Sequence, residues 1–246
     1  MDNYSFNNFA NDYHSKRKKP WRPLQFFLNF LNKKGYVFKG KSLDLGCANG
    51  RNFKLMNNPP NKLIGIDISF NLLKIAKSNL KNDENFNAYA AKFFQLIQAD
   101  AVHLPIREKS IDTIYSIATI HHIKKKIERK RAFIEMYDIL KHKGNLILTV
   151  WRKWQTKFRD YFVWDWIKRN FTMDYRSQQR KKGLEEFGDK YVPWTLSSEN
   201  ITYDRFYHFF SKYELKKLMG IFNIKEFKIT GGPTQKDNFF VFAQKT

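Results

Sequence analysis

The chain has 246 residues, of which 42% are hydrophobic, as expected of one α/β domain with a substantial core. Lysine and arginine total 45 against 23 acidic residues, and the net charge of +22 favours a polyanionic partner, most commonly RNA or DNA. A lysine-rich surface without special function is the alternative. The single cysteine, Cys47, excludes an intrachain disulfide and a cysteine zinc site.

No apolar stretch approaches the length of a membrane span, and the N-terminus lacks the apolar segment of a signal peptide. We therefore expect a cytoplasmic protein without membrane attachment and without a bound metal.

Hydrophobic periodicity and turn residues predict the elements in chain order. A basic N-terminal arm, residues 1–23, precedes a helix over 24–31. The expected strands cover residues 41–46, 63–67, 97–99, 111–117, 145–150, 224–230 and 238–244. One helix is expected to start at Asn49, and four others are expected to cover residues 70–80, 85–96, 127–140 and 211–222. Ser69 is the expected N-cap of the helix over 70–80.

This alternation predicts a Rossmann-like α/β fold, with a seven-stranded, mostly parallel sheet and helices on both faces. Residues 152–200 interrupt the rhythm after the fifth strand, because they are rich in aromatic and basic residues. We expect them to form a helical insertion, or lid, within a single domain that covers residues 1–246.

A candidate cofactor motif lies in residues 42–50, Ser-Leu-Asp-Leu-Gly-Cys-Ala-Asn-Gly. The predicted strand runs into Asp44 and then into a turn of small residues that opens a helix. Gly46 and Gly50 permit positive φ and let a ligand approach bare backbone, and the helix start offers unpaired N–H groups. A nicotinamide dinucleotide site has a related glycine turn but lacks the acid at the strand end.

The order Asp-x-Gly-x-Ala-x-Gly resembles motif I of the class I S-adenosylmethionine-dependent methyltransferases, with Ala48 in place of the usual middle glycine. The next strand ends in Asp67, whose carboxylate can accept both ribose hydroxyls of the cofactor. The resemblance implies that Asp100 meets the adenine amino group and that Ala101 lines the adenine pocket. The expected cofactor-binding residues are Asp44, Gly46, Ala48, Asn49, Gly50, Asp67, Ile68, Asp100, Ala101, Ser116 and Ile117.

Later segments resemble one methyltransferase family in particular. They are Ser-Ile-Ala-Thr-Ile-His-His at 116–122, Val-Pro-Trp at 192–194 and Arg-Phe-Tyr-His-Phe-Phe at 205–210. This set resembles the tRNA wobble-uridine methyltransferases, over nearly the whole chain apart from about 35 residues of the insertion. The resemblance implies S-adenosylmethionine as cofactor and 5-carboxymethyluridine in the tRNA anticodon stem-loop as substrate, its carboxylate becoming a methyl ester. It also implies a small zinc-binding activator subunit as a possible partner.

The substrate residues follow from this chemistry. A carboxylate is already a nucleophile at neutral pH, so the enzyme must chiefly hold its oxygen in line with the methyl group. Arginine grips a carboxylate with its planar fork, and Arg17 and Arg129 are our candidates. His122 follows the fourth strand, at the sheet edge where substrates of such folds bind, and we expect it to orient the uridine. The family resemblance places Tyr207 and Asn238 near the pocket mouth.

Two other functions stay open. A methyltransferase of a small molecule or lipid precursor shares the cofactor motif but does not need the positive charge. A catalytically silent RNA-binding module needs the charge but not the cofactor residues. The basic runs at 16–19, 124–131 and 176–182 are either solvated surface or phosphate contacts.

Overall fold

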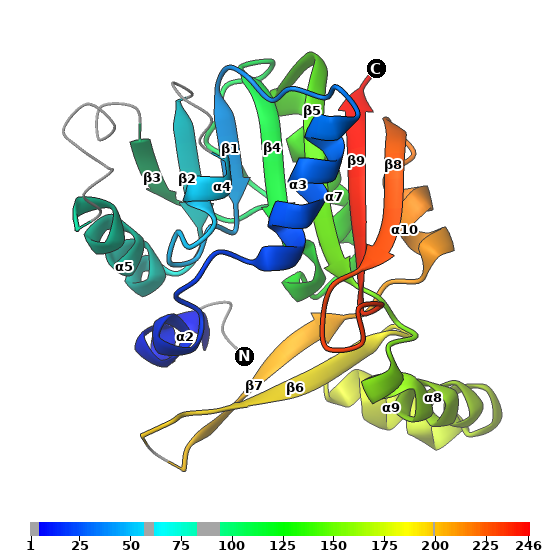
Figure 1. Ribbon diagram of the computed structural model, residues 1–246. Helices are drawn as coiled ribbons and strands as arrows, with labels where there is room; N and C mark the ends of the chain where they lie inside the picture. The colour runs from blue at the N-terminus through cyan, green and yellow to red at the C-terminus, as the bar shows by residue number, and fades with distance from the viewer. Residues whose placement is uncertain (1–4, 57–61, 83–93, 199) are drawn as a thin grey trace.

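The computed structural model describes residues 5–56, 62–82, 94–198 and 200–246 (Figure 1). Its main sheet has seven strands in the order β3-β2-β1-β4-β5-β9-β8. They are β1 (Ser42–Leu45), β2 (Leu63–Asp67), β3 (Phe94–Gln98), β4 (Ile111–Ile117), β5 (Leu140–Trp151), β8 (Phe222–Thr230) and β9 (Asn238–Lys245). Strand β9 pairs antiparallel with both β5 and β8, and all other pairs are parallel, which confirms the predicted mostly parallel sheet.

Helices cover both faces of this sheet, as predicted (Figure 1). One face packs against α3 (Arg22–Lys33), α4 (Phe53–Met56) and α5 (Phe70–Lys81). The other packs against α7 (Lys126–Ile139) and α10 (Lys212–Leu218). Strand β9 contributes Phe240 and Phe242 to the first face and Phe239 and Val241 to the second, so it is buried on both sides.

Most of the predicted elements are present within a few residues. The Ser69 cap is confirmed, because its hydroxyl accepts a hydrogen bond from the backbone N–H of Leu72 at 3.2 Å. The predicted start of the next helix at Asn49 is wrong, because the helix begins at Phe53. Gly50 has φ of 73°, a left-handed conformation that a helix interior does not accept.

The helix expected over 85–96 falls mostly outside the described residues, and its last three residues belong to β3. That strand therefore starts three residues earlier than predicted and pairs in parallel with β2 from Phe94 to Gln98. Phe94 and Leu96 pack against the core on one face of the sheet and Ile97 against the core on the other, and this period of two is that of a strand.

The insertion is helical only in its first half. It contains α8 (Arg159–Phe171) and α9 (Met173–Lys181), then an antiparallel hairpin of β6 (Asp189–Thr195) and β7 (Thr202–His208). The expectation of a helical insertion is therefore wrong for the hairpin. A separate apolar cluster joins its halves, formed by Phe158, Phe162, Val192, Tyr207 and Phe209.

Two short N-terminal helices, α1 (Ser5–Asn8) and α2 (Ala10–Lys16), precede α3. Figure 1 shows α2 and the hairpin below the main sheet, at the end where its parallel strands finish. None of the described helices has both the length and the apolar character that crossing a membrane requires.

Candidate active site

A pocket of about 1770 Å³ lies at the carboxyl ends of β1, β2 and β4. Its floor is the glycine turn at 46–48, and its other walls come from the N-terminal helices, the hairpin and the segment after β4. Ligand sites of doubly wound folds lie at this edge of the sheet. The pocket lies at the edge of the sheet where we expected the ligands to bind. The sequence did not predict the hairpin that forms one of its walls.

The N-terminal arm and the hairpin are fastened to each other across this pocket. The Asp12 carboxylate on α2 accepts hydrogen bonds from the indole N–H of Trp194 and the backbone N–H of Ser197, both at 2.7 Å. The ring of Tyr13 stacks on Trp194 with centroids 5.9 Å apart. Together α2 and the hairpin tip form a cover over the pocket, made from segments far apart in the chain.

The glycine turn has the backbone geometry that a closely held ligand requires. Gly46 has φ of 77°, and a Cβ atom there would collide with the Thr119 side chain. Ala48 also has positive φ, 49°, and its N–H donates to the Asp67 carboxylate at 2.8 Å. The turn is thereby tied to the end of β2, and the alanine accepts a conformation that usually favours glycine.

Two buried carboxylates stand beside the turn. Asp67 lines the pocket and accepts backbone hydrogen bonds from Ala48 and Ser69, both at 2.8 Å, while burial raises its pKa to about 6. Asp44 lies behind the turn, outside the pocket lining, and burial together with the charge of Asp67 raises its pKa to about 8. One oxygen of Asp44 has no hydrogen-bond partner among the described residues. Of the two, Asp67 is therefore the carboxylate that can meet a ligand in the pocket.

The remaining predicted cofactor residues divide into two groups. Those that line the pocket are Gly46, Ala48, Ile68, Asp100, Ala101 and Ile117. Asn49, Gly50 and Ser116 do not line it. The Asn49 amide instead donates to the Arg17 carbonyl at 3.0 Å and so fastens the N-terminal arm to the turn. Ser116 is buried, and its hydroxyl has no partner in the part of the chain that the structure describes.

An aromatic wall faces the cofactor turn across the pocket. Tyr207 stacks on Trp151, with ring centroids 4.2 Å apart, and on His121 at 5.1 Å. Asn238 follows from β9 and also lines the pocket. Of the predicted substrate residues, His122, Tyr207, Asn238 and Arg17 all meet here.

His122 is an uncharged imidazole in this wall. Burial, and then the charge of Arg205, lower its pKa to about 3. Its Nδ1 lies 3.0 Å from the Phe206 carbonyl, which can only accept, so Nδ1 carries the proton. The opposite ring nitrogen, Nε2, is then a hydrogen-bond acceptor.

Arg205 also lines the pocket, and although it belongs to the motif at 205–210, it was not among the predicted site residues. Its guanidinium lies over the rings of Trp194, at 4.5 Å, and Tyr207, at 5.2 Å. It forms no ion pair with any described residue, and its Nε is buried without a hydrogen bond. Arg17 lies on the same Trp194 ring at 5.7 Å. The alternation of Tyr203, Arg205 and Tyr207 along β7 is the signal that places them on one face.

Arg129 corrects the sequence prediction, since it does not reach the pocket. Its side chain is fully buried and donates to the carbonyls of Ile123, at 3.1 Å, and Lys124, at 2.9 Å. It also forms an ion pair with Glu186. An arginine held by these partners is not available to a substrate carboxylate. The sequence does not reveal this, because Glu186 lies in the insertion.

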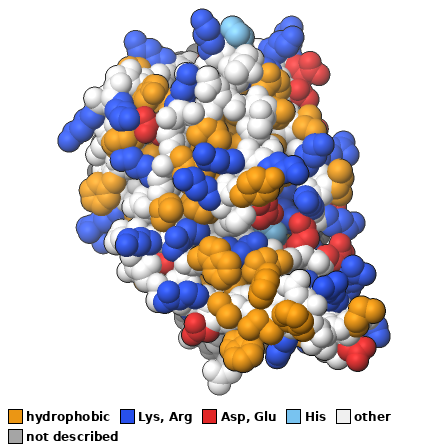
Figure 2. All heavy atoms as spheres, turned by 90° about the vertical axis from the view of Figure 1, so that its right-hand side faces the viewer, with side chains coloured by type: hydrophobic (Ala, Val, Ile, Leu, Met, Phe, Trp, Pro, Cys, Tyr) orange, Lys and Arg blue, Asp and Glu red, His pale blue; other side chains and the backbone are white. Residues whose placement is uncertain are grey.

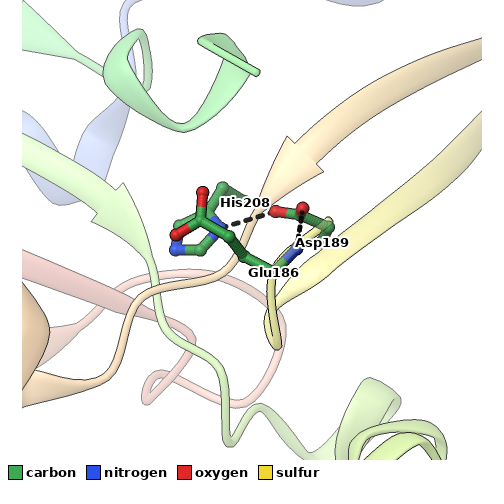
Figure 3. A group of neighbouring side chains, drawn as sticks. All are labelled: Glu186, Asp189 and His208. Atoms are coloured by element: carbon green, nitrogen blue, oxygen red, sulfur yellow. Dashed lines mark hydrogen bonds and ion pairs between the residues drawn. The ribbon is translucent and has the colours of Figure 1, made fainter. Parts of the chain in front are cut away.

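Glu186 belongs to a buried group with Asp189 and His208 (Figure 3). Ligand atoms of the three side chains lie within 4.8 Å of one another, a spacing that a metal ion accepts. His208 joins Asp189 through Nδ1 and Glu214 through Nε2, each at 2.7 Å. Burial would raise the pKa of Glu214, but its bonds to His208 and the charge of Lys153 hold it below the ordinary value.

Positively charged side chains pair with the carboxylates near this group. Lys153 lies 3.9 Å from Glu214, and Arg129 pairs with Glu186. His208 lies between two carboxylates, and each of its ring nitrogens is within hydrogen-bond distance of one of them. The charges favour an internal ion-pair cluster over a metal centre. It anchors the hairpin to α7, α10 and the end of β5.

Proteins that are similar to this chain in sequence include methyltransferases. Residues 43–148 match the family described as a methyltransferase domain. The tRNA (carboxymethyluridine(34)-5-O)-methyltransferase of Schizosaccharomyces pombe is 28% identical over 98% of this chain and 94% of its own length. The Arabidopsis thaliana protein of the same name is 34% identical over 58% of this chain and 30% of its own length.

Solved structures show the same fold. A methyltransferase from Methanosarcina mazei has a TM-score of 0.68 at 19% identity, covering 87% of this chain and 96% of the other. The N-methyltransferase NodS from Bradyrhizobium japonicum, solved with S-adenosylhomocysteine, has a TM-score of 0.56 at 13% identity, covering 91% and 86%. The sheet order and these solved structures show that the chain has the fold of the S-adenosylmethionine-dependent methyltransferases, and its residues 43–148 match a methyltransferase domain.

Proposed function

We propose that the protein methylates the carboxylate of 5-carboxymethyluridine at the wobble position of tRNA and so forms the methyl ester. The observation that carries this proposal is Arg205, a half-buried cation in the pocket with no carboxylate partner among the described residues. The S. pombe and A. thaliana relatives bear the name of this activity. The +22 charge suits a polyanionic substrate.

The residues beside the glycine turn fit the cofactor. S-adenosylmethionine, when bound, supplies a methyl group on a positively charged sulfur, which a carboxylate oxygen accepts without first losing a proton. Asp67 would accept the ribose hydroxyls, and Asp100 and Ala101 would hold the adenine.

Arg205 would hold the substrate carboxylate, with Arg17 beside it. Ring stacking uses the flat faces of the Arg205 guanidinium, and the part of its N–H edge that is not hydrogen-bonded to Tyr207 is left to bind an anion. A carboxylate held by this edge keeps a lone pair for the methyl carbon. The chain has to supply position, not a strong base.

The aromatic wall would receive the uracil ring. Trp151 and Tyr207 offer stacking surfaces, and single-stranded bases are commonly bound in this way. The Nε2 acceptor of His122 complements the N–H of uracil, and the Asn238 amide complements a uracil carbonyl. These groups distinguish a base from a saturated small acid.

The test is transfer of labelled methyl groups from S-adenosylmethionine to tRNA that carries carboxymethyluridine, followed by digestion to nucleosides. The reaction is run with and without a zinc-binding activator subunit, because we propose such a partner on the family resemblance. An alkali-labile, labelled methoxycarbonylmethyluridine is the expected product. No transfer in either case, despite cofactor binding, would favour a small-molecule substrate. With a tRNA substrate, we also propose that the protein works in the cytoplasm.

A further inference from the structure

The outer face of the insertion exposes aromatic side chains among basic ones. On α8, Trp164 is 61% exposed, Trp166 50% and Phe171 78%. Figure 2 views the molecule from the side on which α8 and α9 lie in Figure 1, and it shows hydrophobic side chains gathered in the lower half, bordered by lysines and arginines. Exposed rings in such number mark a binding surface.

A groove of about 340 Å³ lies between α8 and α9, on the side of α8 that carries Trp166. Trp166, Asn170, Arg176 and Arg180 line it, with Glu185 as its one acidic residue. The groove shares no lining residue with the pocket described above. It is therefore a separate site that the methyl-transfer chemistry does not use.

The arginines of the groove differ in their availability. Arg169 is engaged, because its Nε donates to the buried Asp165 carboxylate at 2.8 Å. Arg176 donates its Nε to the Arg169 carbonyl, which fixes its guanidinium at the groove. Arg180 forms no ion pair with a described residue. Two exposed guanidinium groups thus flank an exposed indole ring.

We propose that this groove binds a nucleotide of the RNA substrate outside the catalytic pocket, with a base stacked on Trp166 and a phosphate held by Arg176 and Arg180. The proposal rests on the tRNA activity proposed above. Stacking on an aromatic ring beside arginine is the usual way in which proteins hold single-stranded nucleotides. Arginine also matches phosphate with paired N–H groups.

Continuity with the pocket and local charge favour RNA over a protein partner. Lys157 and Phe158 line the catalytic pocket, and α8 begins at the next residue. At 1.5 Å per residue, Trp166 lies about 10 Å along the helix from its start, so one RNA can reach both sites. The exposed cations around the groove also include Lys168, Lys181 and Lys182, against exposed Asp160 and Asp174.

Binding of fluorescein-labelled tRNA by three variants of the full chain tests this proposal. Arg176→Glu/Arg180→Glu should weaken binding at least tenfold and flatten its salt dependence, because phosphate contacts are lost. Trp166→Ala should weaken binding several-fold with the salt slope kept, because stacking is not ionic. Trp166→Phe should recover most of that loss. The matched control is Lys33→Glu/Lys39→Glu, an equal charge reversal at the far end of the sheet, which should bind more tightly than the groove double variant.

Each variant is also checked for S-adenosylhomocysteine affinity and thermal unfolding, which should match wild type. Groove variants that bind tRNA as the control does would overturn the proposal, even where wild type forms the methyl ester. So would a wild-type dimer that Trp166→Ala converts to monomer with RNA binding unchanged, since the face would then bind protein. If wild type binds tRNA without methylating it, the proposed function fails, and the binding comparison still decides the groove. Wild type without tRNA affinity overturns both.

Discussion

Arg205 differs from Arg129, Arg169 and Lys153 in what it faces. Arg129, Arg169 and Lys153 each lie beside a carboxylate. Arg205 lies between aromatic rings, and burial lowers its pKa although its contact with Tyr207 acts in the opposite direction. An anionic substrate would supply the missing partner.

We expect Arg205→Ala to lower methyl transfer to tRNA by about 100-fold, roughly 3 kcal/mol of positioning, with cofactor affinity unchanged. Arg205→Lys should recover only part, since an ammonium lacks the planar fork. Single-turnover rates and calorimetric cofactor titrations measure the two effects. A fully active Arg205→Ala protein would remove the residue from the site.

Asp67 makes cofactor binding depend on pH. Its pKa is raised to about 6, and a protonated carboxyl cannot accept both ribose hydroxyls. The affinity for S-adenosylhomocysteine should therefore rise about tenfold between about pH 5 and about pH 7, as Asp67 ionises. Asp44, with its pKa raised to about 8, stays mostly protonated over this range.

Calorimetry across these pH values measures the effect. Asp67→Asn should bind weakly at every pH, without that rise and without loss of fold. If the variant binds as tightly as wild type, Asp67 does not hold the ribose.

Residues near the motif could be predicted from sequence because local chain order fixes them. Asp67 must end up beside the turn once β1 and β2 pair. The local sequence does not show which of Arg129 and Arg205 lies in the pocket and which is paired within the protein. Which of them meets a carboxylate depends on Glu186, 57 residues from Arg129, and on a hairpin register that pairs Val192 with Arg205.

Among the elements, the hairpin of β6 and β7 has the largest effect on the site, because it carries Trp194, Arg205 and Tyr207 into the pocket. Aromatic and basic residues at 152–200 suggested helices throughout. The period-two alternation that marks β7 is short, and β6 contains Pro193, a residue that usually argues against a strand. The α/β alternation of the main sheet is longer and more regular, so it was predictable.

The ion-pair cluster joins this hairpin to the rest of the fold, and Arg129, like His208, is fully buried in it. We expect Arg129→Ala to lower the free energy of unfolding by about 3 kcal/mol, because Glu186 loses its partner and two carbonyls lose a donor.

Denaturant unfolding measures this effect. Arg129→Ala/Glu186→Gln should recover part of the loss, because the unpaired charge is removed. If Arg129→Ala is as stable as wild type but does not transfer methyl groups, Arg129 binds substrate after all.

At the scale of the whole molecule, the +22 charge should dominate how the protein meets its substrate. Contact with about six phosphates lowers tRNA affinity by roughly 10³ between 50 and 200 mM salt. Affinity for S-adenosylhomocysteine should change little over the same range. Fluorescence titrations at several salt concentrations measure both, and a salt-independent tRNA affinity would mean that the charge serves another purpose.

Strand β9 lies between β5 and β8 in the sheet yet follows both in the chain. During synthesis, β5 and β8 emerge from the ribosome with nothing between them. The face-spanning residues Phe239 to Ala243, each at most 2% exposed once folded, arrive afterwards. Until β9 inserts, we expect the edges of both neighbouring strands to be open to pairing with other chains. Mutations that slow β9 insertion should reduce yield in cells more than they reduce the stability of the finished protein.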